Sequence, residues 1–116
     1  IQNFNQFHFR SNITAGNMNA LILSQNKISQ IDSIEFKGME MLQKLVLSSN
    51  LIESIENVKF VGISEIEHLD LRGNKIVLAK NKMARFKGIA KLKHLSLAAN
   101  LIENIHSVTF DGIESL

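Results

Sequence analysis

The chain contains no cysteine, proline, tryptophan or tyrosine among its 116 residues. Without cysteine, this sequence has no disulfide, no thiolate metal cluster and no cysteine nucleophile. No apolar run approaches the roughly 18 residues that a helix needs to span a bilayer, so we expect no transmembrane segment. The chain opens on isoleucine and shows no signal-peptide pattern, so we expect a processed chain or an excised fragment.

The charge is small overall and unevenly distributed. Hydrophobic residues make up 45% and charged residues 21% of the chain, which is typical of a folded protein. A net charge of +2 gives no reason to expect a nucleic-acid partner. Residues 72–102 nevertheless carry eight basic residues and no acidic one, between two segments that are net acidic.

Internal periodicity dominates the sequence. Three columns recur in step at intervals of 24 to 26 residues: Asn26, Asn50, Asn74 and Asn100; Phe36, Phe60, Phe86 and Phe110; Gly38, Gly62, Gly88 and Gly112. In register, the units run 18–41, 42–65, 66–91 and 92–115, and residue 116 opens a fifth. Their first nine residues read MNALILSQN, LQKLVLSSN, IEHLDLRGN and LKHLSLAAN. Each follows the pattern L-x-x-L-x-L-x-x-N or a close variant of it.

This pattern resembles the leucine-rich repeat family over residues 18–116. The late Phe-x-Gly step resembles the 24-residue class of animal ectodomains, such as Toll-like receptors and Slit proteins, although the proline common in that class is missing. The resemblance implies an α/β solenoid, a curved right-handed array with short parallel strands on its concave face. The return segments are too short for a full helix in most units, so we expect them to be mostly irregular, extended or 3₁₀-like.

Two segments depart from the period. Residues 1–17 form either an N-terminal cap or the end of an upstream unit, and Phe4, Phe7, Phe9 and Asn12 mimic a strand step. The third unit is two residues longer than the others between Asn74 and its phenylalanine. Because the strand step keeps its register, we expect the extra length to bulge from the return path.

The recurring asparagines have a structural explanation. A polar side chain inside an apolar repeat must be paired, and an amide offers two donors and one acceptor. At the turn after each strand it can bond the backbone of its own unit and of the next. We therefore expect a ladder formed by Asn26, Asn50, Asn74 and Asn100.

The variable positions of the strand step should face out from the concave wall, because side chains alternate along a strand. An apolar pair beside charged groups suits a protein ligand, although a plain solvated face remains the alternative. The predicted ligand-binding residues are Ile22, Lys44, Val46, Glu67, His68, Asp70, Arg72, Lys93, His94 and Ser96.

Other chemistry has weaker support. His68 and His94 should be strand neighbours near Asp70, but a third metal ligand is not assured, so we predict no metal and no cofactor. No nucleophile arrangement or phosphate-binding glycine loop is present, so we predict a protein that is not an enzyme. The basic zone 72–93 suits an anionic partner, or else serves only as a solubilising face.

These features predict a protein–protein recognition module with a protein ligand or co-receptor, and with a homo- or hetero-dimer as a further option. The resemblance implies a segment of a receptor, adhesion or secreted immune-type ectodomain, hence an extracellular or secreted location. Asn12, in the sequon Asn-Ile-Thr, is the candidate glycosylation site. The alternatives are a cytoplasmic scaffold or adaptor, and a regulatory domain of a larger enzyme.

Overall fold

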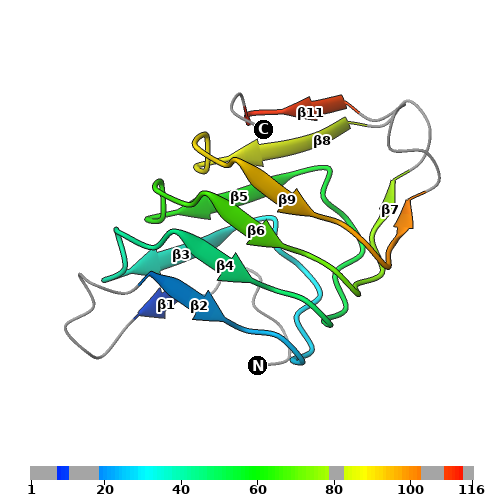
Figure 1. The fold of residues 1–116 in the computed structure, drawn as a ribbon, viewed down its shortest axis with the longest axis horizontal. Coiled ribbons are helices and arrows are strands. Elements are labelled where there is room, and N and C mark those ends of the chain that lie inside the picture. The colour runs from blue at the N-terminus through cyan, green and yellow to red at the C-terminus, as the bar shows by residue number, and fades with distance from the viewer. Residues whose placement is uncertain (1–7, 11–18, 79–82, 103–108, 114–116) are drawn as a thin grey trace.

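The computed structural model describes residues 8–10, 19–78, 83–102 and 109–113. Within these ranges the chain forms eleven strands, labelled β1 to β11, and no helix. The strands belong to two larger parallel sheets and one short pair, and successive coils of the chain stack on one another (Figure 1). The predicted solenoid is therefore confirmed.

The strand steps of the repeat form the four-stranded sheet. Its strands are β2 (Ala20–Ile22), β4 (Lys44–Val46), β6 (His68–Asp70) and β9 (His94–Ser96), and they lie in that order. Equivalent residues pair directly, so the middle leucine of each strand lies opposite the middle leucine of the next. This is the register that the repeat predicts.

The return segments form a five-stranded parallel sheet. Its strands are β1 (His8–Arg10), β3 (Ile34–Lys37), β5 (Val58–Val61), β8 (Met83–Lys87) and β11 (Thr109–Asp111), in that order. The returns are thus non-helical, as expected, and they take the extended form rather than the 3₁₀ form in the described residues. Their assembly into a second sheet is a feature that the sequence analysis did not predict.

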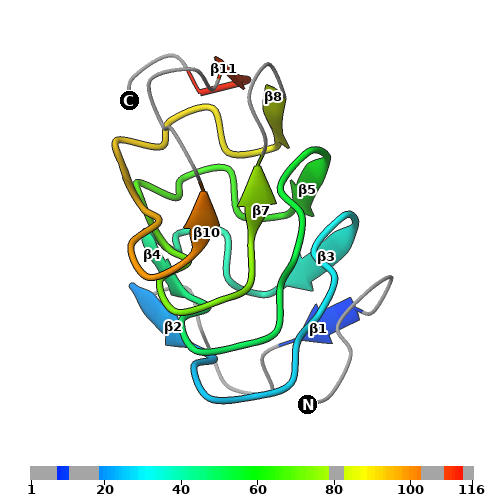
Figure 2. The same cartoon turned by 90° about the vertical axis from the view of Figure 1, so that its right-hand side faces the viewer.

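One flank carries a short strand pair. β7 (Val77–Leu78) and β10 (Leu101–Ile102) pair in parallel where the chain passes from one large sheet to the other (Figure 2). The two extra residues of the third unit fall between Asn74 and Phe86, a stretch that also contains 79–82. The predicted bulge therefore falls partly outside the described residues.

Pairing in the five-stranded sheet is staggered across its interior. Ile34 pairs with Phe60, and Val58 pairs with Phe86, so each strand is displaced by two residues from its repeat equivalent. As a consequence Lys59 lies directly opposite Lys87. The stagger thus brings together residues that occupy different columns of the repeat.

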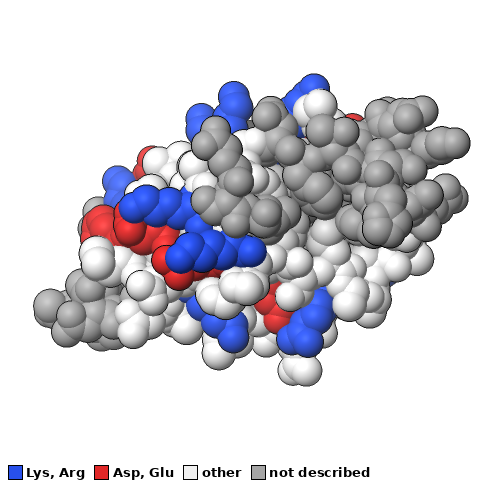
Figure 3. Space-filling model, turned by 45° about the horizontal axis from the view of Figure 1, so that its top comes forward, with Lys and Arg blue, Asp and Glu red and all other residues white. Residues whose placement is uncertain are grey.

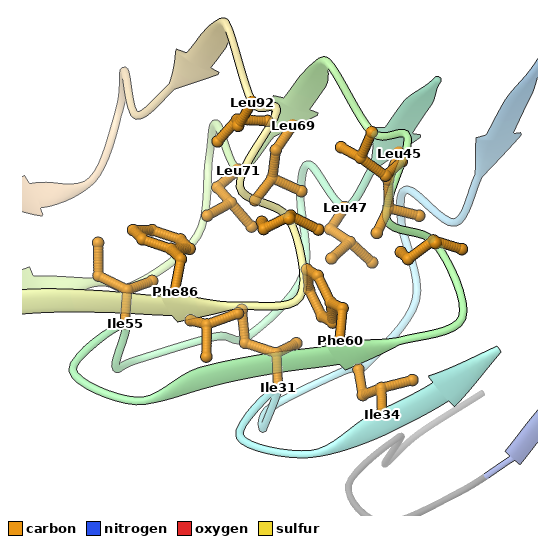
Figure 4. Close-up of a cluster of buried hydrophobic side chains, with 14 of the residues drawn as sticks. Ile31, Ile34, Leu45, Leu47, Ile55, Phe60, Leu69, Leu71, Phe86 and Leu92 are labelled. Carbon is orange, nitrogen blue, oxygen red and sulfur yellow. The ribbon is translucent and has the colours of Figure 1, made fainter. Parts of the chain in front are cut away.

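The hydrophobic core fills the space between the two large sheets (Figure 4). Leu45 and Leu69 point into it from the four-stranded sheet, and Phe60 and Phe86 from the five-stranded sheet. The rings of Phe36 and Phe60 meet edge to face with their centroids 5.8 Å apart. Stacked coils therefore bury side chains that a single coil would leave in water.

The N-terminal strand belongs to the five-stranded sheet. β1 pairs with β3, with Phe9 opposite Phe36, although the spacing of its phenylalanines mimics a strand step. Its backbone pairs as a return segment would, because the alternating Phe-His-Phe sequence suits either sheet. Only 8–10 of residues 1–17 are described, so a cap or the end of an upstream unit stays a prediction.

Candidate functional site

The outer surface of the four-stranded sheet, here called the open face, carries most of the predicted binding residues. One row across it is Ala20, Lys44, His68 and His94. Another is Ile22, Val46, Asp70 and Ser96. These rows alternate with the inward-pointing leucines, so the strand period places the predicted residues on one surface.

An apolar strip lies at the N-terminal side of the open face. Ile22 is 67% exposed, and its strand neighbour Val46 is half-buried. A large exposed aliphatic side chain beside a second one can serve as a binding anchor, because covering it removes apolar surface from water.

A carboxylate and a guanidinium lie next to this strip. Arg72 donates from Nε to Oδ1 of Asp70 at 2.9 Å and from its terminal nitrogen to Oδ2 at 2.8 Å, and its backbone N–H also donates to Oδ1. The Arg72 side-chain hydrogen bonds lower the pKa of Asp70 below its ordinary value, although burial acts in the opposite direction. The same pair raises the pKa of Arg72.

Asp70 differs from its expected exposure. It was predicted to face solvent from the wall, but it is only 8% exposed. It lies between its strand neighbours Val46 and Ser96, and the Arg72 side chain bonds both of its oxygens. The group exposed on the open face is therefore the guanidinium, held in a fixed orientation by a buried carboxylate.

His68 and His94 stack on the open face. Their ring centroids are 4.5 Å apart and the ring planes are inclined by 13°. Lys44 precedes them in the same row. No group of three His, Asp or Glu side chains in a metal-binding arrangement occurs among the described residues. The stacked rings present a flat polar surface that can take part in hydrogen bonds to a partner.

Some basic residues of the predicted basic zone form ion pairs with acidic residues. Lys91 pairs with Glu65 at 2.9 Å and Lys93 pairs with Glu67 at 3.6 Å, in addition to Arg72 with Asp70. Figure 3 shows basic side chains lying against acidic ones on this part of the surface. The zone is therefore partly neutralised, by glutamates of the preceding unit for Lys91 and Lys93 and by Asp70 of the same unit for Arg72.

The remaining basic residues of the zone have no ion pair that the structure describes. Lys80 and Lys82 fall outside the described residues. Lys75, Arg85 and Lys87 are exposed and have no ion pair with an acidic residue whose side chain the structure describes. Arg85 and Lys87 lie on the five-stranded sheet, not on the open face.

The asparagines form bonds that link successive coils. The side-chain oxygen of Asn50 accepts from the backbone N–H groups of Asn26 and Ile28, and its amide donates to the carbonyls of Leu23 and Leu47. The next two asparagines of the column accept from and donate to backbone groups in the same pattern. These side chains are committed to backbone groups, so they serve the turn rather than a ligand.

The residue before each asparagine has a positive φ. Gln25, Ser49, Gly73 and Ala99 have φ between 56° and 68°. Only glycine adopts this left-handed conformation without strain. The turn after each strand therefore imposes backbone strain at Gln25, Ser49 and Ala99. The sequence pattern does not reveal this strain, because only the third unit has glycine at the position before the asparagine.

Lys59 is a candidate residue that the sequence analysis missed. It lies outside the basic zone, but it shares with Arg85 and Lys87 a surface cavity of about 140 Å³, which Asp32 and Asn57 also line. The sequence signal that could have found it is the alternation around each phenylalanine, which places residues 59, 85 and 87 on one sheet surface.

A family model described as leucine rich repeat matches residues 16–76, about half of the chain. Comparisons with curated proteins and with solved structures gave no match. Among the described residues, no helix is both long enough and apolar enough to cross a membrane. The candidate glycosylation site Asn12 lies outside the described residues.

Proposed function

Because the chain belongs to the leucine-rich repeat family, we propose that its open face binds a protein partner. Repeats of this family are generally protein–protein interaction modules. The observation that carries the proposal is the composition of the open face, where an apolar strip adjoins an oriented guanidinium. Such a face offers an anchor and a directional contact together.

The apolar strip supplies the anchor. Ile22 projects from the outer surface of β2 and is mostly exposed, and Val46 extends the strip onto β4. Burial of exposed aliphatic surface contributes about 25 cal/mol per Å² before the costs of association. The strip is small, so polar contacts must contribute to the specificity of binding.

The charged groups supply orientation. Arg72 is held by Asp70 in a two-bond fork, which limits the rotamers that it loses on binding. Lys44 and the stacked His68 and His94 lie in one row beside it. The partner surface that complements this side of the open face carries acidic and hydrogen-bond-accepting groups beside an apolar contact.

We further propose an ectodomain segment of a receptor or adhesion protein as the setting of this module. The support is the 24-residue repeat with its Phe-x-Gly step and the sequon at Asn12. The test is expression of the full-length protein in animal cells, followed by digestion with a peptide N-glycosidase. A mobility shift that Asn12→Gln abolishes is expected. An unglycosylated protein retained in the cytosol would contradict the extracellular setting.

Site-specific photo-crosslinking tests the binding face. The photoreactive residue replaces Lys44 on the open face and, in a matched control, Lys37 on the five-stranded sheet. Each protein is incubated with membranes and secreted proteins from its source, and adducts are identified by mass spectrometry. Adducts from position 44 that disappear with Ile22→Asp are expected. Adducts from position 37 only would place the binding surface elsewhere and refute the proposal.

A further inference from the structure

Three basic side chains converge outside the open face. Lys59 and Lys87 are directly opposite on β5 and β8, and Arg85 lies two residues before Lys87 on the same side of its strand. All three line the cavity of about 140 Å³. Like charges in directly opposed positions destabilise a sheet unless a counter-charge lies between them.

The described acidic residues leave this cluster with a positive charge. None of the three side chains has an ion pair with an acidic residue whose side chain the structure describes. Asp32 lines the same cavity, and in the backbone register Asp111 lies opposite Arg85 on the side away from Lys59. Three cations and one carboxylate in the wall leave a site for an anionic group, and the arginine fork matches a sulfate, phosphate or carboxylate.

A second cavity adjoins the first. It measures about 290 Å³ and is lined by Ser29, Gln30, Ser54 and other residues of the first two of the three coils that line the first cavity. Asp32 and Asn57 line both cavities, so the two adjoin at these residues and are together called the groove. One end of the groove is cationic, and the other offers hydroxyl and amide groups.

We propose that this groove binds an anionic saccharide. The sulfate, phosphate or carboxylate of the sugar lies between Lys59, Arg85 and Lys87. Its hydroxyl groups lie toward the polar end, where Asn57 and Asp32 accept hydrogen bonds from them. Asp32 repels a second negative charge at the middle of the groove, so the other anionic groups of the saccharide lie outside it.

The walls of the groove favour a saccharide over an acidic peptide. Acidic peptides are typically recognised by clusters of arginines, and other peptides by a free strand edge or by pockets for apolar side chains. The lining of the two cavities contains a single arginine, Arg85. The aliphatic residues that line the groove, Ile31 and Val58, are 2% and 1% exposed, so they offer no apolar contact. The exposed groups are hydroxyls, amides and charges, which are the complements of a hydroxyl-rich anionic ligand.

The test is fluorescence anisotropy with a short, labelled heparin-derived oligosaccharide and the whole chain at near-physiological salt. The comparison probes are the same oligosaccharide after desulfation, inorganic sulfate, and a glutamate-rich peptide of equal charge. Lys59→Gln and Lys87→Gln remove one charge each from the groove. Lys75→Gln is the matched control, because Lys75 is exposed, unpaired with any described acid and absent from the lining of both cavities. Thermal melts establish that each variant is folded.

The proposal predicts binding of the sulfated oligosaccharide that weakens at least about tenfold in each groove variant, the loss expected for one charge-assisted contact. Lys75→Gln should bind like the unmodified chain. Asn57→Ala should weaken binding of the oligosaccharide without changing that of inorganic sulfate.

Three results would overturn the proposal. An equal loss of affinity in Lys75→Gln would show that the oligosaccharide binds by general electrostatic attraction and not in the groove. Equal affinity for the desulfated oligosaccharide would remove the role of the cations. Equal affinity for the glutamate-rich peptide, or no binding of the oligosaccharide, would show that the groove does not select a saccharide. Because none of these probes involves the open face, failure here leaves the proposed protein-binding function unaffected.

Discussion

The carbonyl oxygen of Phe60 occupies the space that a β-carbon on Gly88 would need. Gly88 has a φ of 90°, which side-chain-bearing residues rarely adopt. Gly62 meets the carbonyl of Phe36 in the same way, one coil earlier. The glycine of the Phe-x-Gly step at these positions is therefore required by a close backbone contact between successive coils.

Gly88→Ala should destabilise the fold strongly, because the added methyl group must displace the backbone of the neighbouring coil. Gly73→Ala is the matched control, since Gly73 also has a positive φ but its β-carbon would meet only atoms of Ser49, the nearest being the hydroxyl oxygen at 3.4 Å. Gly73→Ala should lower the free energy of unfolding by about 1 kcal/mol, from the left-handed backbone alone, and Gly88→Ala should lower it by at least about twice that amount. Urea denaturation measures both, and equal costs would refute the close coil contact.

Asn74→Ala should lower the free energy of unfolding by about 3 kcal/mol, because each orphaned buried polar group costs about 1–3 kcal/mol. The substitution leaves the Ile52 N–H and the carbonyls of Leu47 and Leu71 without their amide partner. Asn50→Ala should lower the free energy of unfolding by a similar amount, because Asn50 makes the corresponding bonds one coil earlier. Equal melting temperatures for Asn74→Ala and the unmodified chain would contradict the ladder.

Ala99→Gly should stabilise the chain by about 0.5–1 kcal/mol, since glycine relieves most of the cost of a left-handed backbone. Ala99 is exposed and has a φ of 57°, so no packing is lost. Ala98→Gly, at the exposed neighbouring position, lacks a positive φ and should destabilise instead. The pair is compared by thermal melting, and a drop in melting temperature for Ala99→Gly would be the opposite of the expected result.

The Asp70–Arg72 pair should make stability depend on pH. The pKa of Asp70 in the folded chain is below the ordinary value of 3.8, so the folded state favours the carboxylate. The resulting stabilisation is present above that ordinary value and is lost as the pH falls through the lowered one. Urea denaturation at a series of pH values should show this loss in the unmodified chain.

Two variants control for the other carboxylates of the chain. Asp70→Asn should remove this part of the pH dependence, and Arg72→Ala should raise the pKa of Asp70 by removing its hydrogen bonds. An identical acid dependence in Asp70→Asn would show that other groups account for it.

The four-stranded sheet was predictable from the sequence because its residues repeat in register. The spacing of Leu45 and Leu69 gave the buried row directly, and Lys44 opposite His68 followed from the same alignment. The asparagine bonds were also predictable in kind, because a buried amide must be paired.

The five-stranded sheet was harder to predict because its strands are staggered by two residues. A repeat alignment places Lys59 beside Arg85, whereas the structure pairs it with Lys87. The burial of Asp70 also required coordinates, since it depends on how Arg72 folds back over the strand. These features depend on packing between coils, which the columns of the repeat do not encode.

Disulfide trapping tests the stacking of the coils most directly, because the chain has no cysteine of its own. Lys44 and His68 are paired on adjacent strands, so cysteines at these positions lie within the roughly 7 Å between α-carbons that a disulfide tolerates. Ala20 and His68 are two strands apart, at about twice the strand spacing of about 4.8 Å, and are too distant. After mild oxidation, mass spectrometry should find an intramolecular disulfide in Lys44→Cys/His68→Cys and none in Ala20→Cys/His68→Cys. Efficient bridging of positions 20 and 68, or none between 44 and 68, would contradict the stacked register on which the fold and both binding surfaces depend.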